Sequence, residues 1–257
     1  MDYAVEVDHL EVTYWSPSGP VAALAGVSLS VRSGEFVSIL GPSGCGKSTL
    51  LLAVAGLLQP TRGHVRVDGK PVQGPVREIG MVFQDHLLLD WRTVLDNVLL
   101  QIDLRGLSRS AFLPSARALL GRMGLRGFET KYPFELSGGM RQRVAIARAI
   151  IHNPRLLLMD EPFGALDALT REQIRVDLER LWMEWRNTVL FVTHDIAEAI
   201  LLGDRVVIMT SRPGRLADIV PVSLPRPRTA DILARPEFLD YRARIQGVLY
   251  KMGVLRV

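Results

Sequence analysis

The chain of 257 residues is 48% hydrophobic and 23% charged, a composition typical of a soluble globular protein large enough to bury a substantial core. Its 31 lysines and arginines exceed its 27 aspartates and glutamates only slightly, a surplus more typical of ordinary surface charge than of nucleic-acid or lipid binding. The single cysteine excludes an intramolecular disulfide, and the sequence has neither a membrane-spanning apolar run nor a signal-peptide pattern, so we expect a cytoplasmic protein.

The chain begins with two segments of alternating apolar residues, 5–12 and 27–31, separated by the turn-forming stretch 16–20. This pattern predicts a pair of antiparallel strands. Tyr14 and Trp15 lie just before the turn. Either ring is suited to stacking on a purine base, although an aromatic residue at a strand end is more often part of the packing.

A phosphate-binding loop follows between the apolar run 36–40, which predicts a buried strand, and the helix-forming segment 49–56. The loop fits the pattern G-x-x-x-x-G-K-[ST], in which backbone N–H groups and the start of a helix surround phosphates. Lys47 would contact the β- and γ-phosphates of a nucleoside triphosphate, and the Ser48 hydroxyl would bind Mg²⁺. We interpret Cys45 as a small residue that fills the loop rather than as a catalytic thiol. The predicted phosphate-binding residues are Gly41, Pro42, Ser43, Gly44, Cys45, Gly46, Lys47, Ser48 and Thr49.

Gln84 follows the next predicted strand, 79–83. From its position it could reach Mg²⁺ or a water, or it could simply begin a loop, and the sequence leaves both interpretations open. The stretch 91–151 has a helical pattern with few strand signals, so we expect a helical lobe inserted in the sheet domain. Thr93 and Ser108 are predicted N-caps of helices in this lobe.

A second candidate anion site lies at 136–140, where the sequence is LSGGM. Ser137 and two glycines open a strongly helical run, 141–151, and N–H groups at the start of a helix bind anions. An ordinary N-cap has the same pattern, so the motif gains its weight from the residues that follow it.

The apolar strand 156–161 ends in two acids, Asp160 and Glu161. Ligands of α/β proteins bind at the carboxyl ends of strands. Asp160 is suited to holding Mg²⁺, and Glu161 to polarising the attacking water as a general base. The alternative, that both acids cap the next helix, is disfavoured because the sequence 162–164 is Pro-Phe-Gly.

His194 ends another predicted strand, 188–193, at the same edge of the sheet. There it would contact a γ-phosphate, or it would be an internal structural histidine. The remaining expected elements are helices at 169–185, 196–202 and 236–252 and strands at 205–210 and 219–222.

Taken in order, the phosphate loop, Gln84, LSGGM at 136–140, LLLMDEP at 156–162, Asp167 and His194 resemble the nucleotide-binding subunit of ABC transporters. The resemblance extends from about residue 5 to about residue 222. It implies an α/β P-loop NTPase (ABC ATPase) fold with a mainly parallel core sheet, an antiparallel β subdomain and an inserted helical subdomain at about 87–152. The nucleotide-binding domain would comprise residues 1–230, followed by a helical extension, 231–257.

The resemblance also implies a role for each site residue. Tyr14 would stack on adenine, with Trp15 as the fallback, and Glu161 and His194 would be catalytic. Two copies of the chain would join head to tail, so that the signature of one copy covers the ATP bound by the other. The residues implied to bind Mg²⁺ are Ser48, Gln84 and Asp160, and those implied to complete the ATP site are Leu136, Ser137, Gly138, Gly139, Met140 and Asp167.

Four stretches are similar to importers of the nitrate, sulfonate and taurine type, namely GPSGCGKSTLL from 41, QDHLLLDWRTVLDNV from 84, DEPFGALDALT from 160 and LPRPR from 224. This likeness implies an ATPase that powers uptake of such a solute from the cytoplasmic face of the inner membrane. Its partners would be integral-membrane permease subunits and, indirectly, a periplasmic or extracellular substrate-binding protein, with no nucleic acid. An exporter ATPase, an ABC ATPase of a nucleic-acid process and a P-loop kinase are the alternatives.

Overall fold

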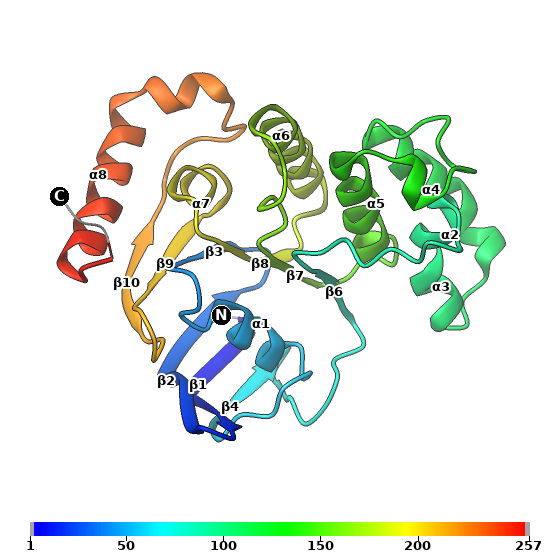
Figure 1. Ribbon diagram of the computed structural model, residues 1–257. Coiled ribbons are helices and arrows are strands. Elements are labelled where there is room, and N and C mark those ends of the chain that lie inside the picture. Colours follow the sequence, from blue (N-terminus) through cyan, green and yellow to red (C-terminus); the bar gives the residue numbers. More distant parts are fainter. Residues whose placement is uncertain (1–2, 255–257) are drawn as a thin grey trace.

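The computed structural model describes residues 3–254 and contains two sheets surrounded by helices (Figure 1). The strands are β1 (Tyr3–Ser16), β2 (Gly19–Arg32), β3 (Phe36–Leu40), β4 (Arg62–Val67), β5 (Lys70–Pro71), β6 (Ile79–Val82), β7 (Leu156–Asp160), β8 (Thr188–Thr193), β9 (Arg205–Met209) and β10 (Leu216–Pro221). The helices are α1 (Lys47–Val54), α2 (Val94–Val98), α3 (Leu100–Leu104), α4 (Arg109–Arg122), α5 (Gly138–Ile150), α6 (Ala168–Trp185), α7 (Ile196–Leu202) and α8 (Pro236–Lys251), with 3-10 turns η1 (Pro133–Glu135) and η2 (Ala230–Ala234).

The larger sheet has the strand order β10-β9-β3-β8-β7-β6, and β10 alone pairs antiparallel within the described residues. Its central strands β3 and β8 are buried along their whole length, which explains why they are continuous apolar runs in the sequence. In the register of the sheet, Leu40 pairs with Thr193 and Asp160 with Val192. The loops that follow β3, β7 and β8 therefore leave the sheet at one edge.

The two faces of this sheet pack against different helices. Val37 and Ile39 point into a cluster that contains α1 and the antiparallel sheet β2-β1-β4-β5, whereas Phe36 points into the cluster formed by α5 and α6. Figure 1 shows α1 below the central strands and α5, α6 and α7 above them. The helix after the phosphate loop and the helix that begins at the LSGGM motif thus lie on opposite faces of the sheet.

The helical lobe, α2 to α5, joins β6 to β7, as predicted, and extends to one side of the molecule (Figure 1). Thr93 caps α2, since its hydroxyl accepts from the Asp96 amide at 3.2 Å. Ser108 occupies the N-cap position of α4 but makes no cap hydrogen bond, and its hydroxyl pairs with that of Ser110 at 3.0 Å. The capping prediction is therefore correct for Thr93 and wrong for the Ser108 hydroxyl.

The C-terminal α8 packs on β9, β10 and α7 through a third apolar cluster. Arg228 anchors the segment that precedes α8 to the end of α7. Its buried guanidinium donates to the carbonyls of Ile200 and Gly203 at 2.6 Å each. Burial lowers the pKa of Arg228 to about 10. The predicted nucleotide-binding domain, 1–230, and the predicted helical extension, 231–257, include residues 1–2 and 255–257, which lie outside the described part of the chain.

Candidate active site

The phosphate loop has the backbone that its glycines make possible. Gly44 and Gly46 have φ of 73° and 101°, a region that other residues adopt only at a cost. A Cβ on Gly46 would also lie 2.7 Å from Leu24 Cδ2 and 2.8 Å from the Ala23 carbonyl. Gly46 is the N-cap of α1 and has no side chain to satisfy the first amides of the helix, so these N–H groups can donate to an anionic ligand.

Cys45 is buried in this loop, and burial raises the pKa of its thiol. A neutral, buried thiol is a poor nucleophile. The structure therefore favours the loop-filling interpretation over the catalytic one.

Lys47 and Ser48 extend from the start of α1 towards the end of β7. The Lys47 ammonium is buried and donates to the carbonyls of Gly41 and Pro42 at 2.9 and 3.0 Å. The Ser48 hydroxyl donates to Asp160 Oδ1 at 3.0 Å. Both side chains are thus held at the mouth of the loop.

The donor set around Ser48 fits Mg²⁺. A hydroxyl and a carboxylate are hard oxygen ligands, and Mg²⁺ is usually bound by one or two carboxylates together with substrate phosphates and water. Burial raises the pKa of Asp160, the neighbouring Glu161 charge acts in the same direction, and the Ser48 hydrogen bond opposes both. A cation beside Asp160 would relieve this cost of ionising a buried carboxyl. Residues 3–254 contain no group of three or more His, Cys, Asp or Glu side chains that could hold a metal without such a substrate.

The Glu161 carboxylate lies between the Lys47 ammonium and the His194 ring. Its Oε1 lies 3.2 Å from Lys47 Nζ and its Oε2 lies 2.9 Å from His194 Nδ1. No helix follows it directly, since α6 begins at Ala168, so Glu161 is not a helix cap. The structure brings the predicted base, the predicted phosphate-binding lysine and the predicted γ-phosphate contact into one cluster.

His194 is exposed at the end of β8 and is not an internal structural residue. The neighbouring Asp195 caps α7 by accepting from the Glu198 amide at 2.9 Å. Thr193 Oγ1 donates to Glu198 at 2.6 Å. These bonds fix the backbone on both sides of His194 and leave its ring directed at the edge of the sheet.

Tyr14 contacts the end of the phosphate loop, whereas Gln84 lies near Glu161. The Tyr14 hydroxyl lies 3.2 Å from Thr49 Oγ1 in α1, whereas Trp15 is 80% exposed. Gln84 is exposed just beyond β6, and a Cβ built on Gly164 would lie 3.8 Å from its Nε2 and 3.9 Å from Glu161 Oε2. The Gln84 amide and the Glu161 carboxylate therefore border the same space.

The LSGGM residues lie elsewhere, on the opposite face of the sheet. Ser137 caps α5 by accepting from the Met140 amide at 3.3 Å, and Asp167 caps α6 by accepting from the Thr170 amide at 3.0 Å. The two helices approach closely there, because a Cβ on Gly139 would lie 2.2 Å from Thr170 Cγ2. One chain thus brings the signature and Asp167 together, but not onto its own phosphate loop.

Sequence reasoning missed the residues that tie the Gln84 loop to α5. Arg148 donates to the carbonyls of His86 and Leu87 at 2.8 and 2.6 Å, and His86 Nδ1 lies 2.6 Å from Gln142 Oε1. Gln142 is completely buried. A glutamine on the apolar face of a predicted helix was the available signal, since a buried amide needs a partner.

Comparison with known proteins then decides the family. The family model described as ABC transporter matches residues 24–164, from before the phosphate loop to just beyond Glu161. The chain belongs to the ABC transporter family. An uncharacterized ABC transporter ATP-binding protein of Methanocaldococcus jannaschii is 45% identical over 249 residues, 97% of this chain and 92% of that protein. The taurine import ATP-binding protein TauB of Escherichia coli K12 is 43% identical over 252 residues, 96% of this chain and 97% of that protein.

Solved structures agree with the family assignment. The dimeric structure of MJ0796, a bacterial ABC transporter cassette, has a TM-score of 0.77 and 35% identity, and covers 86% of this chain and 100% of its own. A dimeric post-hydrolysis structure of the same cassette bound to ADP and Pi gives the same values. The predicted ABC ATPase fold is confirmed, and this ABC transporter chain is an ATP-binding and ATP-hydrolysing subunit. Within residues 3–254, no helix combines the length and apolar character that crossing a bilayer requires.

Proposed function

We propose that this chain is the ATPase subunit of an importer, and that it powers the uptake of a small solute of the nitrate, aliphatic sulfonate or taurine class from the cytoplasmic face of the inner membrane. The similarity to TauB over nearly the whole of both chains supports the importer class. The observation that supports the chemistry is the cluster in which Lys47 and His194 hold the two oxygens of Glu161.

In the proposed mechanism, residues 41–49 hold the triphosphate and Tyr14 stacks on adenine. Ser48, Asp160 and Gln84 would hold Mg²⁺, which when bound neutralises charge on the β- and γ-phosphates. Glu161 accepts a proton from the water that attacks the γ-phosphorus as the bond to the β-phosphate oxygen breaks. His194 holds the γ-phosphate in line with that water.

A second copy of the chain would complete the site. Because α1 and α5 pack on opposite faces of one sheet, the signature at 136–140 is suited to covering ATP bound by a partner. Beside it, Asp167 and the 85% exposed Leu169 lie at the start of α6, where they would face the other copy. The dimeric MJ0796 structures support a homodimer, and the position of the signature relative to the phosphate loop supports its head-to-tail arrangement.

A groove beside the Gln84 loop is the proposed docking site of the permease. It has a volume of about 870 Å³ and runs between α3 and the segment that leads into β6. Leu57, Leu87 and Leu104 line it and are 52%, 56% and 73% exposed. An apolar helix of a membrane partner would cover these side chains, whereas a substrate-binding protein would act only through the permease and nucleic acid would have no part.

Complementation tests the composite site. Chains carrying Lys47→Ala lack the phosphate contact, and chains carrying Ser137→Arg lack the signature contact, so each is expected to be inactive alone. Mixed dimers retain one intact site, and ATPase activity is expected to return on mixing. Absence of any recovered activity, with mixed dimers demonstrated by pull-down of differently tagged chains, would refute the head-to-tail arrangement.

Growth tests the importer class. A strain lacking this chain is expected to lose growth on one of nitrate, taurine or alkanesulfonates as sole nitrogen or sulfur source, and Glu161→Gln is expected not to restore it. Normal growth on all these sources together with accumulation of an intracellular compound would instead assign an exporter.

A further inference from the structure

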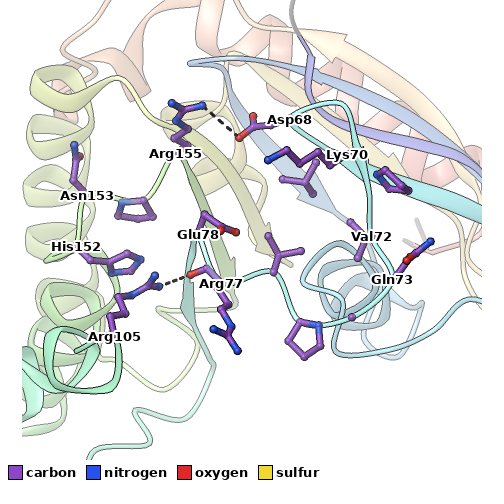
Figure 2. Close-up of a pocket in the computed structure, with 16 residues that line it drawn as sticks. Asp68, Lys70, Val72, Gln73, Arg77, Glu78, Arg105, His152, Asn153 and Arg155 are labelled. Carbon is purple, nitrogen blue, oxygen red and sulfur yellow. Dashed lines mark hydrogen bonds and ion pairs between the residues drawn. The ribbon is translucent and has the colours of Figure 1, made fainter. Parts of the chain in front are cut away.

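A pocket of about 730 Å³ lies at the edge of the central sheet opposite the nucleotide site (Figure 2). Its residues Glu78 and Arg155 directly precede β6 and β7, whereas the catalytic residues follow the carboxyl ends of β3, β7 and β8. None of the residues in the proposed mechanism lines this pocket. The proposed mechanism of ATP hydrolysis therefore does not account for the charged residues that line this pocket.

Three parts of the fold contribute walls to the pocket. The β4–β5 hairpin and the segment up to Glu78 form one wall, the loop 152–155 between α5 and β7 forms a second, and Arg105 at the end of α3 forms the third. The antiparallel sheet, the core sheet and the helical lobe therefore all meet here. A ligand in this pocket would touch all three.

The lining carries more cations than anions. Lys70, Arg77, Arg105 and Arg155 face the pocket, against the two carboxylates of Asp68 and Glu78. Arg155 lies 3.9 Å from Asp68, a long ion pair, and is 84% exposed. Figure 2 shows Lys70 and Arg155 extending towards each other from opposite walls beside Asp68, with Arg105 at the other end of the pocket.

The wall at Arg105 also contains buried polar atoms without partners. Arg105 donates from Nη2 to the Arg77 carbonyl, but its Nε is a buried donor with no hydrogen-bond partner in the described part of the chain. His152 Nε2 lies 3.3 Å from the Ile79 carbonyl and so carries the proton, which leaves the buried Nδ1 without a partner among residues 3–254. Burial and the nearby Arg105 charge lower the pKa of His152 to about 4, so the ring is neutral and offers Arg105 no charge. A buried N–H donor without a partner is costly, and an anionic ligand that accepts from it would offset that cost.

We propose that this pocket binds a small organic polyanion whose carboxylate or phosphoryl groups reach Arg105 at one end and Lys70 and Arg155 at the other. Guanidinium and ammonium groups recognise both kinds of anion. The volume exceeds that of a single phosphate ion, and Val72, Pro75 and Val76 make part of the lining apolar. Two anionic groups joined by a short carbon frame match this arrangement.

Binding there would affect ATP hydrolysis. Arg105 belongs to the helical lobe that carries the signature, whereas Lys70 belongs to β5 of the antiparallel sheet and Arg155 to the loop that leads into β7 of the core sheet. A polyanion that holds these cations together fixes the lobe relative to the phosphate loop and changes the ATPase rate. This inference rests on the ATPase activity alone and not on the identity of the transported solute.

Calorimetry with two probes tests the site. The host is the full chain with Lys47→Ala, which weakens anion binding at the phosphate loop, and the probes are tricarballylate for carboxylates and pyrophosphate for phosphoryl groups. We expect saturable binding of at least one probe, and binding of one alone identifies the anion class. Lys70→Gln with Arg155→Gln is expected to weaken that binding by about tenfold for each charge-assisted hydrogen bond that the substitutions remove.

The controls separate this site from general charge. Lys70 and Arg155 are exposed, so their replacement tests binding even if Arg105→Gln fails to fold. Arg242→Gln with Lys251→Gln, at two exposed positions of α8, removes the same two charges far from the pocket and is expected to leave binding unchanged. Absence of saturable binding, or equal affinity in the double variant, would overturn the proposal.

The effector role has its own readout. With Lys47 intact and Mg²⁺ in excess, tricarballylate or, if only phosphoryl groups bind, pyrophosphate at saturating concentration is expected to change the ATPase rate about twofold or more, which corresponds to a change of about 0.4 kcal/mol in the activation free energy. The change should disappear in the Lys70 and Arg155 double variant. If the probe binds the intact pocket but changes the ATPase rate no more than it does in the double variant, regulation through the pocket is excluded.

Discussion

Lys47 and Glu161 form an ion pair across the proposed nucleotide site, with Nζ and Oε1 3.2 Å apart. Lys47 is 4% exposed and Glu161 17%, so the pair is shielded from solvent. The proposed phosphate-binding cation and the proposed base therefore neutralise each other. A triphosphate that takes over Lys47 would release a carboxylate oxygen to orient water, so substrate binding would itself prepare the base.

Glu161→Gln is expected to bind ATP and to lose turnover by about 10² to 10⁴-fold, since an amide does not accept the proton of the attacking water. Phosphate release measures turnover, and calorimetry with ATP measures binding. Glu237→Gln, at an exposed position of α8, is the matched control and should retain full activity. Turnover of Glu161→Gln at the wild-type rate would rule out Glu161 as the base.

Gly139→Ala is expected to impair ATPase activity, because the new Cβ would lie 2.2 Å from Thr170 Cγ2 and would push α5 away from α6. Thr170→Ser removes that methyl group and keeps the hydroxyl, and the next nearest atom, Thr170 Cβ, is 3.6 Å away. The double variant should therefore recover most of the activity, and a double-mutant cycle should give a coupling of about 1 to 3 kcal/mol. Additive decreases in kcat would show that this packing of α5 on α6 does not position the signature.

Much of this fold could be predicted from the sequence because its signals are local. Alternating residues predict β1 and β2, and the glycines at 44 and 46 specify the phosphate loop. The contact of Gly139 with Thr170 could not be predicted, because it depends on how closely two helices pack. The basic pocket is likewise invisible in the sequence, since Lys70, Arg105 and Arg155 are far apart along the chain and only the fold brings them together.

Arg148→Met is expected to detach the Gln84 loop from α5, because it removes the donors to the His86 and Leu87 carbonyls. Each hydrogen bond to a charged group contributes about 1.5 to 3 kcal/mol, so unfolding by urea should show a decrease in stability of about 2 kcal/mol or more. Arg122→Met removes an arginine whose ion pair with Glu184 is half exposed, and should cost much less. Equal decreases in the two variants would contradict a specific role of Arg148.

We expect His152 to make the stability of the folded protein decrease in acid. Its pKa of about 4 in the folded protein lies below the ordinary value, because burial and then the Arg105 charge disfavour the protonated ring. The unfolded chain therefore binds more protons between the two values, so the contribution of His152 to stability is complete above the ordinary pKa and is lost as the pH falls towards 4. After allowance for partial exposure this decrease is about 1 to 2 kcal/mol.

His152→Gln keeps a donor for the Ile79 carbonyl without titrating, so its free energy of unfolding should fall less between pH 7 and pH 4.5. Urea unfolding at both pH values, with His64→Gln as the exposed control, measures the difference, and parallel pH profiles for wild type and His152→Gln would show that this ring does not sense acid.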